Sequence, residues 1–283
     1  MNEIKIDNLG FLINSISRQL NESDTPRLDS QVLLSEILEK SRSWIISHPE
    51  VHLTKDQNKR LSIAMDKLNN GIPLPYILGK WEFYNLEFKI NPNVLIPRPE
   101  TELLVDKAIQ WLNSNPKSRH AADIGTGSGC IAISLLVNIP DLFLDATDIS
   151  SDAISVARSN SKKHNVEERI NIYQVDLFTD RKKKYNLITA NLPYIPSQTL
   201  KDLKIFGKEP TIALDGGPSG FEEINRFLDE GKNHLASGGL MLIEIESNQG
   251  NRAIETAKRY FPEAEISLQT DLAGFDRLIC IQK

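Results

Sequence analysis

Residues 186–195 predict a buried β-strand that runs into a polar turn, and their sequence is Asn186-Leu187-Ile188-Thr189-Ala190-Asn191-Leu192-Pro193-Tyr194-Ile195. The apolar residues before Asn191 form a short run that is typical of a central strand. Pro193 has no N–H to give to a strand ladder, so it must lie beyond the end of the strand. Asn191 is therefore expected at the carboxyl edge of a sheet.

The turn itself offers two hydrogen-bond acceptors. Leu192 precedes a proline, which favours an extended backbone, so its carbonyl and the side-chain oxygen of Asn191 can point the same way. One NH₂ group would satisfy both acceptors, and the ring of Tyr194 can cover a planar amide or base. We therefore predict that Asn191, Leu192, Pro193 and Tyr194 are catalytic and bind the acceptor substrate. An ordinary strand-to-loop turn is the alternative interpretation.

From about Ser118 the sequence alternates between predicted strands and helices, which is typical of an α/β domain with a parallel sheet and helices on both faces. The predicted strands are residues 119–123, 142–147, 170–175, 185–190, 240–246, 264–269 and 276–281. The predicted helices are residues 129–138, 150–163, 219–236 and 248–260. In such a domain the ligand is expected at the carboxyl edge of the sheet.

A glycine-rich loop follows the first of these strands, with the sequence Asp123-Ile124-Gly125-Thr126-Gly127-Ser128-Gly129-Cys130. Glycines let a backbone bend tightly and approach a ligand. Cys130 occupies the place of the third glycine of the dinucleotide fingerprint, so the spacing disfavours NAD. The Asp123 carboxylate would repel a pyrophosphate. It could hold the amine of a cationic ligand such as S-adenosylmethionine, through a water or a backbone amide.

Two further carboxylates end the next two strands. Asp148 stands where an acidic side chain accepts both hydroxyls of an adenosine ribose. Asp176 could accept the adenine amine while Leu177 or Phe178 packs on the ring. Each feature alone is also explained as a turn or a helix cap. Together, at successive strand ends, they predict a site for an adenosine cofactor.

Residues 1–72 predict a small helical domain. Asp24 can cap its second helix, which has Pro26 in the first turn. A third helix is predicted from Thr54 to Asn70, and it begins with a capping-box pattern. Because these helices contain no cluster of His, Cys or carboxylate residues, we interpret them as a docking module or a lid. A purely structural appendage is the alternative.

Residues 73–97 predict a linker that contains a β-hairpin centred on Asn85. The linker leads into a stiff, proline-braced turn, Pro97-Arg98-Pro99-Glu100-Thr101-Glu102, which opens a helix. Such a turn can hold Arg98 or Glu100 toward a neighbouring pocket. A local helix cap with a glutamate at the N-terminus is the alternative.

The composition restricts the class of protein. The 283 residues allow one large and one small domain, and the net charge is −5 with a pI ≈ 5.6, which disfavours a dedicated DNA-binding protein. Cys130 and Cys280 lack metal-ligand spacing, so neither a metal site nor a disulfide framework is predicted. No apolar leader or membrane-spanning stretch is present. We expect a cytoplasmic protein without a nucleic-acid or membrane partner.

The motifs resemble those of the peptide chain release factor N5-glutamine methyltransferases, the PrmC/HemK family of class I enzymes. The resemblance covers nearly the whole chain, and the Arg-Pro-Glu-Thr-Glu stretch combined with the Asn-x-Pro-Tyr turn is highly specific. The matching stretches are Pro75-Tyr76-Ile77-Leu78-Gly79, Val94 to Glu102, Asp123 to Cys130, Asp148, Asp176 to Phe178, Asn191 to Tyr194, Glu209-Pro210 and Ala213 to Gly217.

This resemblance implies a domain organisation and a fold. A helical release-factor docking domain would occupy residues 1–72 and a hairpin linker residues 73–97. Residues 98–283 would form a class I S-adenosylmethionine-dependent methyltransferase domain, which is an α/β, Rossmann-like fold with a seven-stranded sheet.

The resemblance also implies roles for individual residues. The cofactor S-adenosylmethionine would contact the glycine loop, Asp148, Asp176 with Leu177, and Asn191. Its methionine part would be lined by Gly125, Thr126, Gly127, Ser128 and Gly129. The acceptor glutamine would be held by Asn191 through Tyr194, with Arg98 as a further substrate-binding residue. The usual turn of the family is Asn-Pro-Pro-Tyr, and we expect function to survive Leu192 because Pro193 still restrains its carbonyl.

The implied reaction is methyl transfer to the side-chain amide nitrogen, N5, of the glutamine in the Gly-Gly-Gln motif of class I release factors. It needs no metal, leaves S-adenosyl-L-homocysteine, and modulates translation termination. The nearest alternative is an N6-adenine or guanine-N2 methyltransferase acting on DNA or RNA, since the turn suits any planar exocyclic amine. A non-catalytic module that senses the cofactor is the alternative from another class. The net charge argues against the first of these, and the presence of both the glycine loop and the turn argues against the second.

Overall fold

The computed structural model describes residues 8–20, 23, 25–180 and 182–283. These residues divide after Gly79 into two compact units, which are described separately. The division falls inside the stretch 73–97 that the sequence predicted to be a linker. Among the described residues, no helix combines the length and the apolar character needed to cross a membrane.

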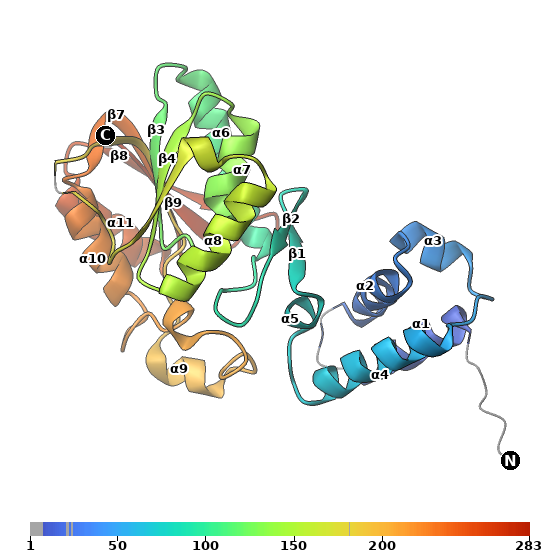
Figure 1. Cartoon of the computed structure of the whole chain (residues 1–283). Coiled ribbons are helices and arrows are strands. Elements are labelled where there is room, and N and C mark those ends of the chain that lie inside the picture. Colours follow the sequence, from blue (N-terminus) through green and yellow to red (C-terminus); the bar gives the residue numbers. More distant parts are fainter. Residues whose placement is uncertain (1–7, 21–22, 24, 181) are drawn as a thin grey trace, which may run out of the picture. The chain divides into compact units, whose positions relative to one another are not determined.

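The first unit is helical (Figure 1). Its helices are α1 (Leu9–Gln19), α2 (Pro26–Leu38), α3 (Arg42–Ser47), α4 (Lys55–Asn69) and α5 (Leu74–Leu78). The three long helices were predicted, whereas α3 and α5 are too short to show a helical period in the sequence. Thr54 and Gln57 exchange side chain to backbone hydrogen bonds, which confirms the predicted capping box. The predicted cap at Asp24 lies outside the described residues, and Thr25 is the N-cap of α2.

One apolar cluster forms the core of this unit. Its buried members come from every helix of the unit, and they include Leu9, Leu33, Leu34, Ile45, Leu61 and Leu74. Each helix therefore buries one stripe and leaves its other side to solvent, as the periodicity requires. Burial of this apolar surface is the main free-energy term that holds the unit together.

The second unit begins with the predicted hairpin, formed by β1 (Lys80–Phe83) and β2 (Leu86–Lys89). Tyr84 and Asn85 both have positive φ, 51° and 57°, which matches the strand twist of a two-residue hairpin turn. The side chain of buried Asn160 accepts from the Lys89 N–H at 2.8 Å and donates to the carbonyl oxygens of Lys89 and Ser128. This one amide therefore ties the hairpin to the glycine loop.

A seven-stranded sheet in the order β5-β4-β3-β6-β7-β9-β8 is the centre of the second unit. Its strands are β3 (His120–Ile124), β4 (Phe143–Asp148), β5 (Ile170–Gln174), β6 (Tyr185–Ala190), β7 (Leu235–Glu244), β8 (Glu265–Thr270) and β9 (Asp276–Gln282). All seven were predicted. The prediction of a parallel sheet is correct for β3 to β7 and wrong for β9, which is antiparallel to both neighbours. A turn of only a few residues joins β8 to β9, and such a turn can only reverse the chain.

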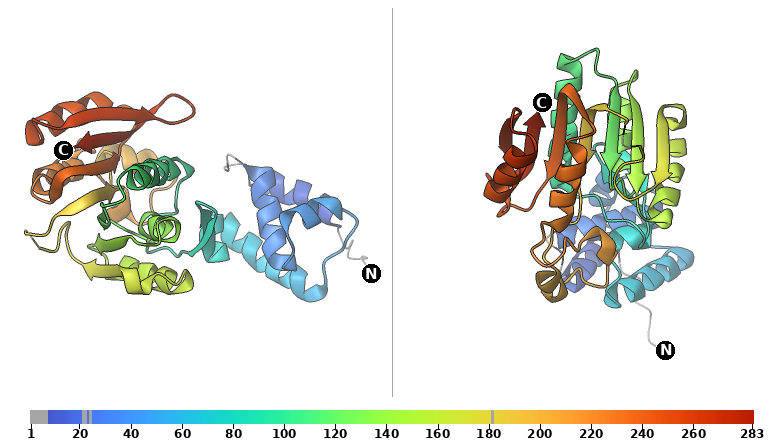
Figure 2. Two further views of the ribbon diagram at one scale, coloured as in Figure 1. Left: turned by 90° about the horizontal axis from the view of Figure 1, so that it is seen from above. Right: turned by 90° about the vertical axis from the view of Figure 1, so that its left-hand side faces the viewer.

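Helices cover both faces of the sheet, as predicted. Figures 1 and 2 agree that α6 (Glu102–Ser114), α7 (Cys130–Asn138) and α8 (Ser151–Lys163) lie on one face. The other face carries α10 (Glu222–Gly231) and α11 (Gly250–Tyr260). The predicted helix 219–236 is too long, because Leu235 already belongs to β7 and is fully buried in the sheet. The short helix α9 (Ser197–Asp202) was not predicted.

The strand order places two loops together. From β3 the chain adds β4 and β5 on one side, and it then returns to place β6 on the other side of β3. The loops that follow β3 and β6 therefore leave the sheet side by side, at the point where the strand order reverses. Open α/β sheets bind ligands at such a point, because the two loops diverge and leave a crevice.

Candidate active site

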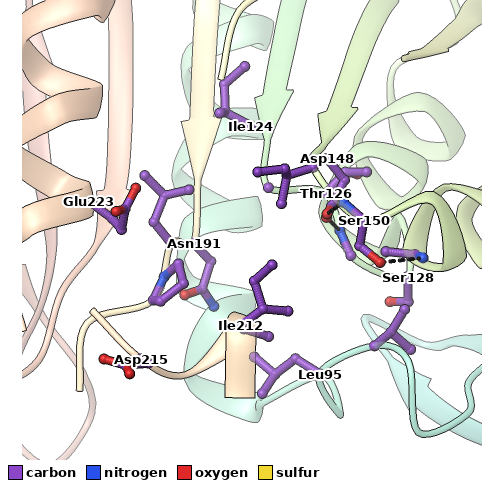
Figure 3. A pocket seen from close by; sticks show the side chains of 18 of the residues that line it. Leu95, Ile124, Thr126, Ser128, Asp148, Ser150, Asn191, Ile212, Asp215 and Glu223 are labelled. Carbon is purple, nitrogen blue, oxygen red and sulfur yellow. Dashed lines mark hydrogen bonds between the residues drawn. The ribbon is translucent and has the colours of Figure 1, made fainter. Parts of the chain in front are cut away.

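A cavity of ≈ 660 Å³ opens at this crevice, within the size range of small-molecule sites. It is lined by residues from the loops after β3, β4, β5 and β6, from the stretch before α6 and from residues 211–217. Figure 3 shows Asp148, Thr126 and Ser128 on one side of this cavity and Asn191 on the opposite side, with Ile212 and Leu95 between them. The predicted cofactor loop and the predicted acceptor turn therefore face the same space.

The three glycines of the glycine loop share one backbone conformation and serve two different purposes. Gly125, Gly127 and Gly129 all have positive φ, at 71°, 56° and 82°. A Cβ on Gly125 would lie 3.0 Å from Leu192 Cδ2, and one on Gly129 would lie 2.9 Å from Ile133 Cδ1. A Cβ on Gly127 would meet no atom within 4 Å, and Gly127 lines the cavity. Gly125 and Gly129 thus permit close packing, whereas Gly127 leaves open backbone that a ligand can approach.

Asp148 joins the end of β4 to the glycine loop. Its Oδ2 accepts the N–H of Gly127 at 2.8 Å, and its Oδ1 accepts the N–H of Ser150 at 2.9 Å. Burial raises the pKa of this carboxyl, and the backbone hydrogen bonds oppose that rise. Each carboxylate oxygen has more than one lone pair, so the side chain keeps acceptor capacity toward the cavity that it lines.

Asp123 lies beneath the glycine loop and does not line the cavity. It is 1 % exposed, and it accepts hydrogen bonds from the hydroxyls of Thr126 at 2.7 Å and Thr189 at 2.8 Å. Burial raises its pKa to about 6. In this structure the carboxylate joins the glycine loop to β6, and its predicted contact with the ligand's amine remains a prediction.

Asp176 and Leu177 line the cavity beyond the end of β5. Leu177 is buried and has a φ of 62°, a conformation that is strained for a leucine, and its carbonyl accepts the Thr147 hydroxyl at 2.7 Å. Asp176 forms an ion pair with Arg226 at 2.7 Å. Arg226 and its neighbour Glu223 also line the cavity, and the sequence offered no reason to select either.

Asn191 is held by residues from two distant segments. Its side-chain NH₂ donates to the Thr101 hydroxyl at 3.1 Å, and that hydroxyl donates to Glu244 at 2.6 Å. The Tyr194 hydroxyl donates to the other oxygen of Glu244 at 3.3 Å. Among the described residues, none donates a hydrogen bond to the Asn191 Oδ1 or to the Leu192 carbonyl, so both acceptors are available to a ligand.

The loop 214–220 holds the backbone of the Asn191 turn through hydrogen bonds and close packing. Ile195 and Leu214 form a backbone hydrogen bond at 3.1 Å, and the Gly216 N–H donates to the Ile195 carbonyl at 2.9 Å. A Cβ on Gly216 would lie 2.7 Å from the Pro193 carbonyl oxygen, so only glycine fits there. The buried Gln249 side chain donates to the Tyr194 carbonyl at 3.1 Å. The turn is therefore rigid, which favours precise placement of a ligand.

Arg98 lines the cavity from the stretch before α6. Its guanidinium pairs with Glu209 at 2.5 Å, and Glu209 also accepts the Ile96 N–H at 3.1 Å. The carboxylate of Glu209 is buried, so this pair fixes the direction of Arg98. The substrate-binding role predicted for Arg98 remains a prediction.

Of the predicted residues, Asp123, Gly129 and Tyr194 do not line the cavity, although all three support residues that do. Glu100 and Phe178, named as alternatives to Arg98 and Leu177, do not line it either, and Phe178 stacks on Phe227 and His234 instead. Thr101 and Glu244 were not selected from the sequence. Glu244 could have been found, because it is a carboxylate enclosed by apolar residues, the run Leu240-Met241-Leu242-Ile243 before it and Ile245 after it. Within the described part of the chain, no group of three or more His, Cys, Asp or Glu residues could hold a metal ion.

Comparison with known proteins gives consistent matches. The family described as the PrmC N-terminal domain matches residues 12–79, and the methyltransferase small domain family matches residues 100–205. A release factor glutamine methyltransferase from Coxiella burnetii is 38% identical over 273 residues, which are 95% of this chain and 96% of that protein. One from Moorella thermoacetica is 36% identical over 256 residues, which are 90% of each chain.

A solved structure supports the fold. The hMettl16 catalytic domain in complex with the MAT2A 3′UTR hairpin 6 superposes with a TM-score of 0.56 at 16% identity. The match covers 70% of this chain and 76% of that chain. At this identity the likeness concerns the fold alone, which is that of a class I methyltransferase.

Proposed function

The chain belongs to the release factor glutamine methyltransferase family, and we propose that it methylates the side-chain amide nitrogen of a glutamine in class I release factors. One observation carries this proposal beyond the family. The unpaired Asn191 Oδ1 and the open backbone of Gly127 line one cavity. An acceptor amide and a methyl donor can therefore meet there.

The residues of the cavity fit S-adenosylmethionine as the methyl donor. The space beside Gly127 is open, and Asp148 and Asp176 line the cavity at successive strand ends. Gly127 would lie against the methionine part, Asp148 would accept from the ribose hydroxyls, and Asp176 with Leu177 would border the adenine. When bound, this group supplies a methyl on a positively charged sulfur.

The turn matches the chemical difficulty of the acceptor. An amide nitrogen is a poor nucleophile, because its lone pair is delocalised into the carbonyl. Asn191 Oδ1 and the Leu192 carbonyl accept its two N–H groups, which orients the nitrogen and stabilises the positive charge that it gains. The carbon–sulfur bond of the donor would break as the carbon–nitrogen bond forms, and the methylated nitrogen would then lose one N–H proton to solvent. The packing of Tyr194 over the amide plane stays a prediction from the sequence, because its ring does not line the cavity in this structure. The chain thus contributes alignment and electrostatics, and the proposed reaction needs no covalent intermediate and no metal.

The protein partner is a class I release factor, and the modified residue is the glutamine of its Gly-Gly-Gln motif. We place this modification in the cytoplasm, where release factors act on the ribosome, and expect it to modulate termination. The helical unit of residues 8–79 contributes a docking surface for the body of the factor. A DNA or RNA substrate is not expected, since the chain carries a net charge of −5.

The proposal is tested with labelled S-adenosylmethionine and purified class I release factors. Mass spectrometry should place one methyl group on the glutamine of the Gly-Gly-Gln motif, and a factor with that glutamine changed to alanine should take up no label. Structured RNA and duplex DNA serve as competing acceptors in parallel reactions. Label on a nucleic acid, with an unlabelled release factor, would refute the proposed substrate.

A further inference from the structure

We propose that Thr101 and Glu244 are positioning residues that decide which end of the Asn191 amide faces the acceptor glutamine. This inference rests on the proposed function, because it explains how the acceptor side of the cavity is oriented. Neither residue lies near Asn191 in the sequence, and Glu244 does not line the cavity. Its effect therefore passes through Thr101.

The terminal amide of an asparagine can rotate by half a turn at little cost, which exchanges the positions of its oxygen and its NH₂ group. With Oδ1 toward the cavity, Asn191 accepts an N–H of the glutamine. With the NH₂ toward the cavity, it would offer a donor to another donor. Only the first orientation binds the acceptor amide, so something in the protein must select it.

The selection follows from counting protons along the chain of hydrogen bonds. An ionised Glu244 can only accept, so the single hydroxyl proton of Thr101 points toward it at 2.6 Å. The Thr101 oxygen then has only lone pairs left for Asn191, which lies 3.1 Å away. The Asn191 atom at that place must be the NH₂ group, and Oδ1 must face the cavity.

Burial makes this selection strong. Thr101 is 2 % exposed and Glu244 is 4 % exposed, so little water competes with either partner, although Thr101 borders the cavity. A donor facing a donor in such surroundings leaves two polar groups unpaired, which costs far more than it does in water. Tyr194, from the same turn as Asn191, donates to the second oxygen of Glu244 and so holds the carboxylate from the other side.

The charged and titratable groups that act on Glu244 come from several elements. Glu100, next to Thr101, raises the pKa of Glu244, whereas Arg277 of β9 and the hydrogen bonds from Thr101 and Tyr194 lower it. Arg98 acts on the hydroxyl of Tyr194. Burial is the largest cause, and it raises the pKa of Glu244 to about 7. A protonated Glu244 can donate to Thr101, which frees the Thr101 proton to turn toward Asn191.

The test compares Thr101→Val, Thr101→Ser and Glu244→Gln with the parent in single-turnover methyl transfer to a release factor at saturating cofactor. Thr101→Val keeps the shape and loses the hydroxyl, and it should slow transfer about tenfold or more, the worth of one hydrogen bond. Thr101→Ser should restore most of that rate. Cofactor affinity should stay within about twofold, since Gly127 and Asp148 are unchanged. Thr256→Val, at a buried threonine of α11, is the matched control.

The pH profile separates positioning from a merely structural role. Transfer by the parent should fall as the pH drops through about 7, where Glu244 gains its proton. Glu244→Gln should be slower than the parent and should lose this inflection. A parental rate in Thr101→Val, together with an inactive Asn191→Ala, would overturn the inference and leave the proposed function intact.

A second measurement needs neither a variant nor activity. In parent protein labelled with ¹⁵N-asparagine, the NH₂ protons of Asn191 should exchange with solvent more slowly than those of the exposed Asn233 at the same pH. This protection should be large above pH 8 and smaller below pH 6, as Thr101 releases the protons, and the comparison at one pH removes the base catalysis that speeds every amide as the pH rises. No protection at either pH would overturn the inference even if the variants fail to fold. If the parent shows the protection above pH 8 but methylates no release factor, the proposed function fails and the positioning role of Thr101 stands.

Discussion

The carboxylate of Asp148 accepts a hydrogen bond from the backbone N–H of Gly127, with an N···O distance of 2.8 Å. The end of β4 and the middle of the glycine loop are thereby fixed to each other. Because Gly127 is also the glycine that opens toward the cavity, the Asp148 side chain both shapes the loop and lines the cavity.

Asp148→Ala should therefore weaken the binding of S-adenosylmethionine by about 2–3 kcal/mol, the worth of one or two charge-assisted hydrogen bonds. Isothermal titration calorimetry measures this change. Asp152→Ala, at an exposed carboxylate in the first turn of α8, is the control and should bind normally. Unchanged affinity in Asp148→Ala would show that the ribose is held elsewhere. NAD should not bind to the parent, because the glycine spacing does not suit its pyrophosphate.

Gly125→Ala tests the contact between the glycine loop and the acceptor turn. The added Cβ would lie 3.0 Å from Leu192 Cδ2, in a backbone conformation that alanine disfavours. Gly274→Ala has the same kind of strain, at a φ of 85°, with no atom within 4 Å of the new Cβ. Gly125→Ala should cost about 1–2 kcal/mol more in unfolding free energy than Gly274→Ala.

The double variant Gly125→Ala/Leu192→Ala tests directly whether the new Cβ meets the Leu192 side chain, because that side chain is removed. Denaturant unfolding should show that the two substitutions together cost less than the sum of the single ones. Strict additivity would mean that Leu192 moves aside freely. Methyl transfer by Leu192→Ala alone should change little, because the carbonyl of that residue is retained and Pro193 still restrains it.

Asn191→Ala removes one of the two acceptors for the glutamine amide. Turnover should fall by roughly 10²–10³, as it does when one preorganised polar group is lost from an active site, while cofactor affinity changes much less. Single-turnover transfer at saturating cofactor measures the effect. Asn233→Ala, at an exposed asparagine before β7, should behave like the parent. Near-parental transfer by Asn191→Ala would move the search for the acceptor site toward Arg98.

Protonation of Glu244 should stabilise the fold, although it slows the proposed reaction. The stability should therefore fall as the pH rises, whereas the rate should increase. Burial raises its pKa from the ordinary value of 4.5 to about 7 in the folded state, so its proton stabilises the fold. That contribution is complete below pH 4.5 and is lost as the pH rises through about 7. Glu244→Gln should therefore gain roughly 2–3 kcal/mol of unfolding free energy relative to the parent between pH 5 and pH 8.

Denaturant unfolding of both proteins at the two pH values measures this difference. Other carboxyls, such as those of Glu87 and Asp271, have lowered pKa values and oppose the trend, but they are present in both proteins and cancel. A pH-independent difference between the two proteins would mean that Glu244 is ionised over the whole range.

Removal of residues 1–79 tests the docking role of the helical unit. The truncated protein should bind S-adenosylmethionine with nearly parental affinity, because every residue that lines the cavity follows Gly79. Methylation of an intact release factor should fall much further than methylation of a short Gly-Gly-Gln peptide. Circular dichroism should first establish that the truncated chain is folded. Equal losses on factor and peptide would rule out docking by this unit.

Local patterns in the sequence determined the elements of the site. Apolar runs with defined ends placed the strands, and those ends placed Asp148 at the end of one strand and Gly127 and Asn191 just beyond two others. These features depend on side-chain period and backbone freedom over a few residues, which a sequence displays directly. The capping box at Thr54 was predictable for the same reason.

Only the tertiary structure decided how these elements meet. The return of the chain from β5 to the far side of β3 brings the Asn191 turn against Gly125, and the short β8–β9 turn makes β9 antiparallel. Thr101 reaches Asn191 across 90 positions of sequence, and Glu244 reaches Thr101 across 143. Such contacts depend on the free energy of packing whole elements and on the loss of water around a buried carboxylate. Neither quantity belongs to any short stretch of sequence.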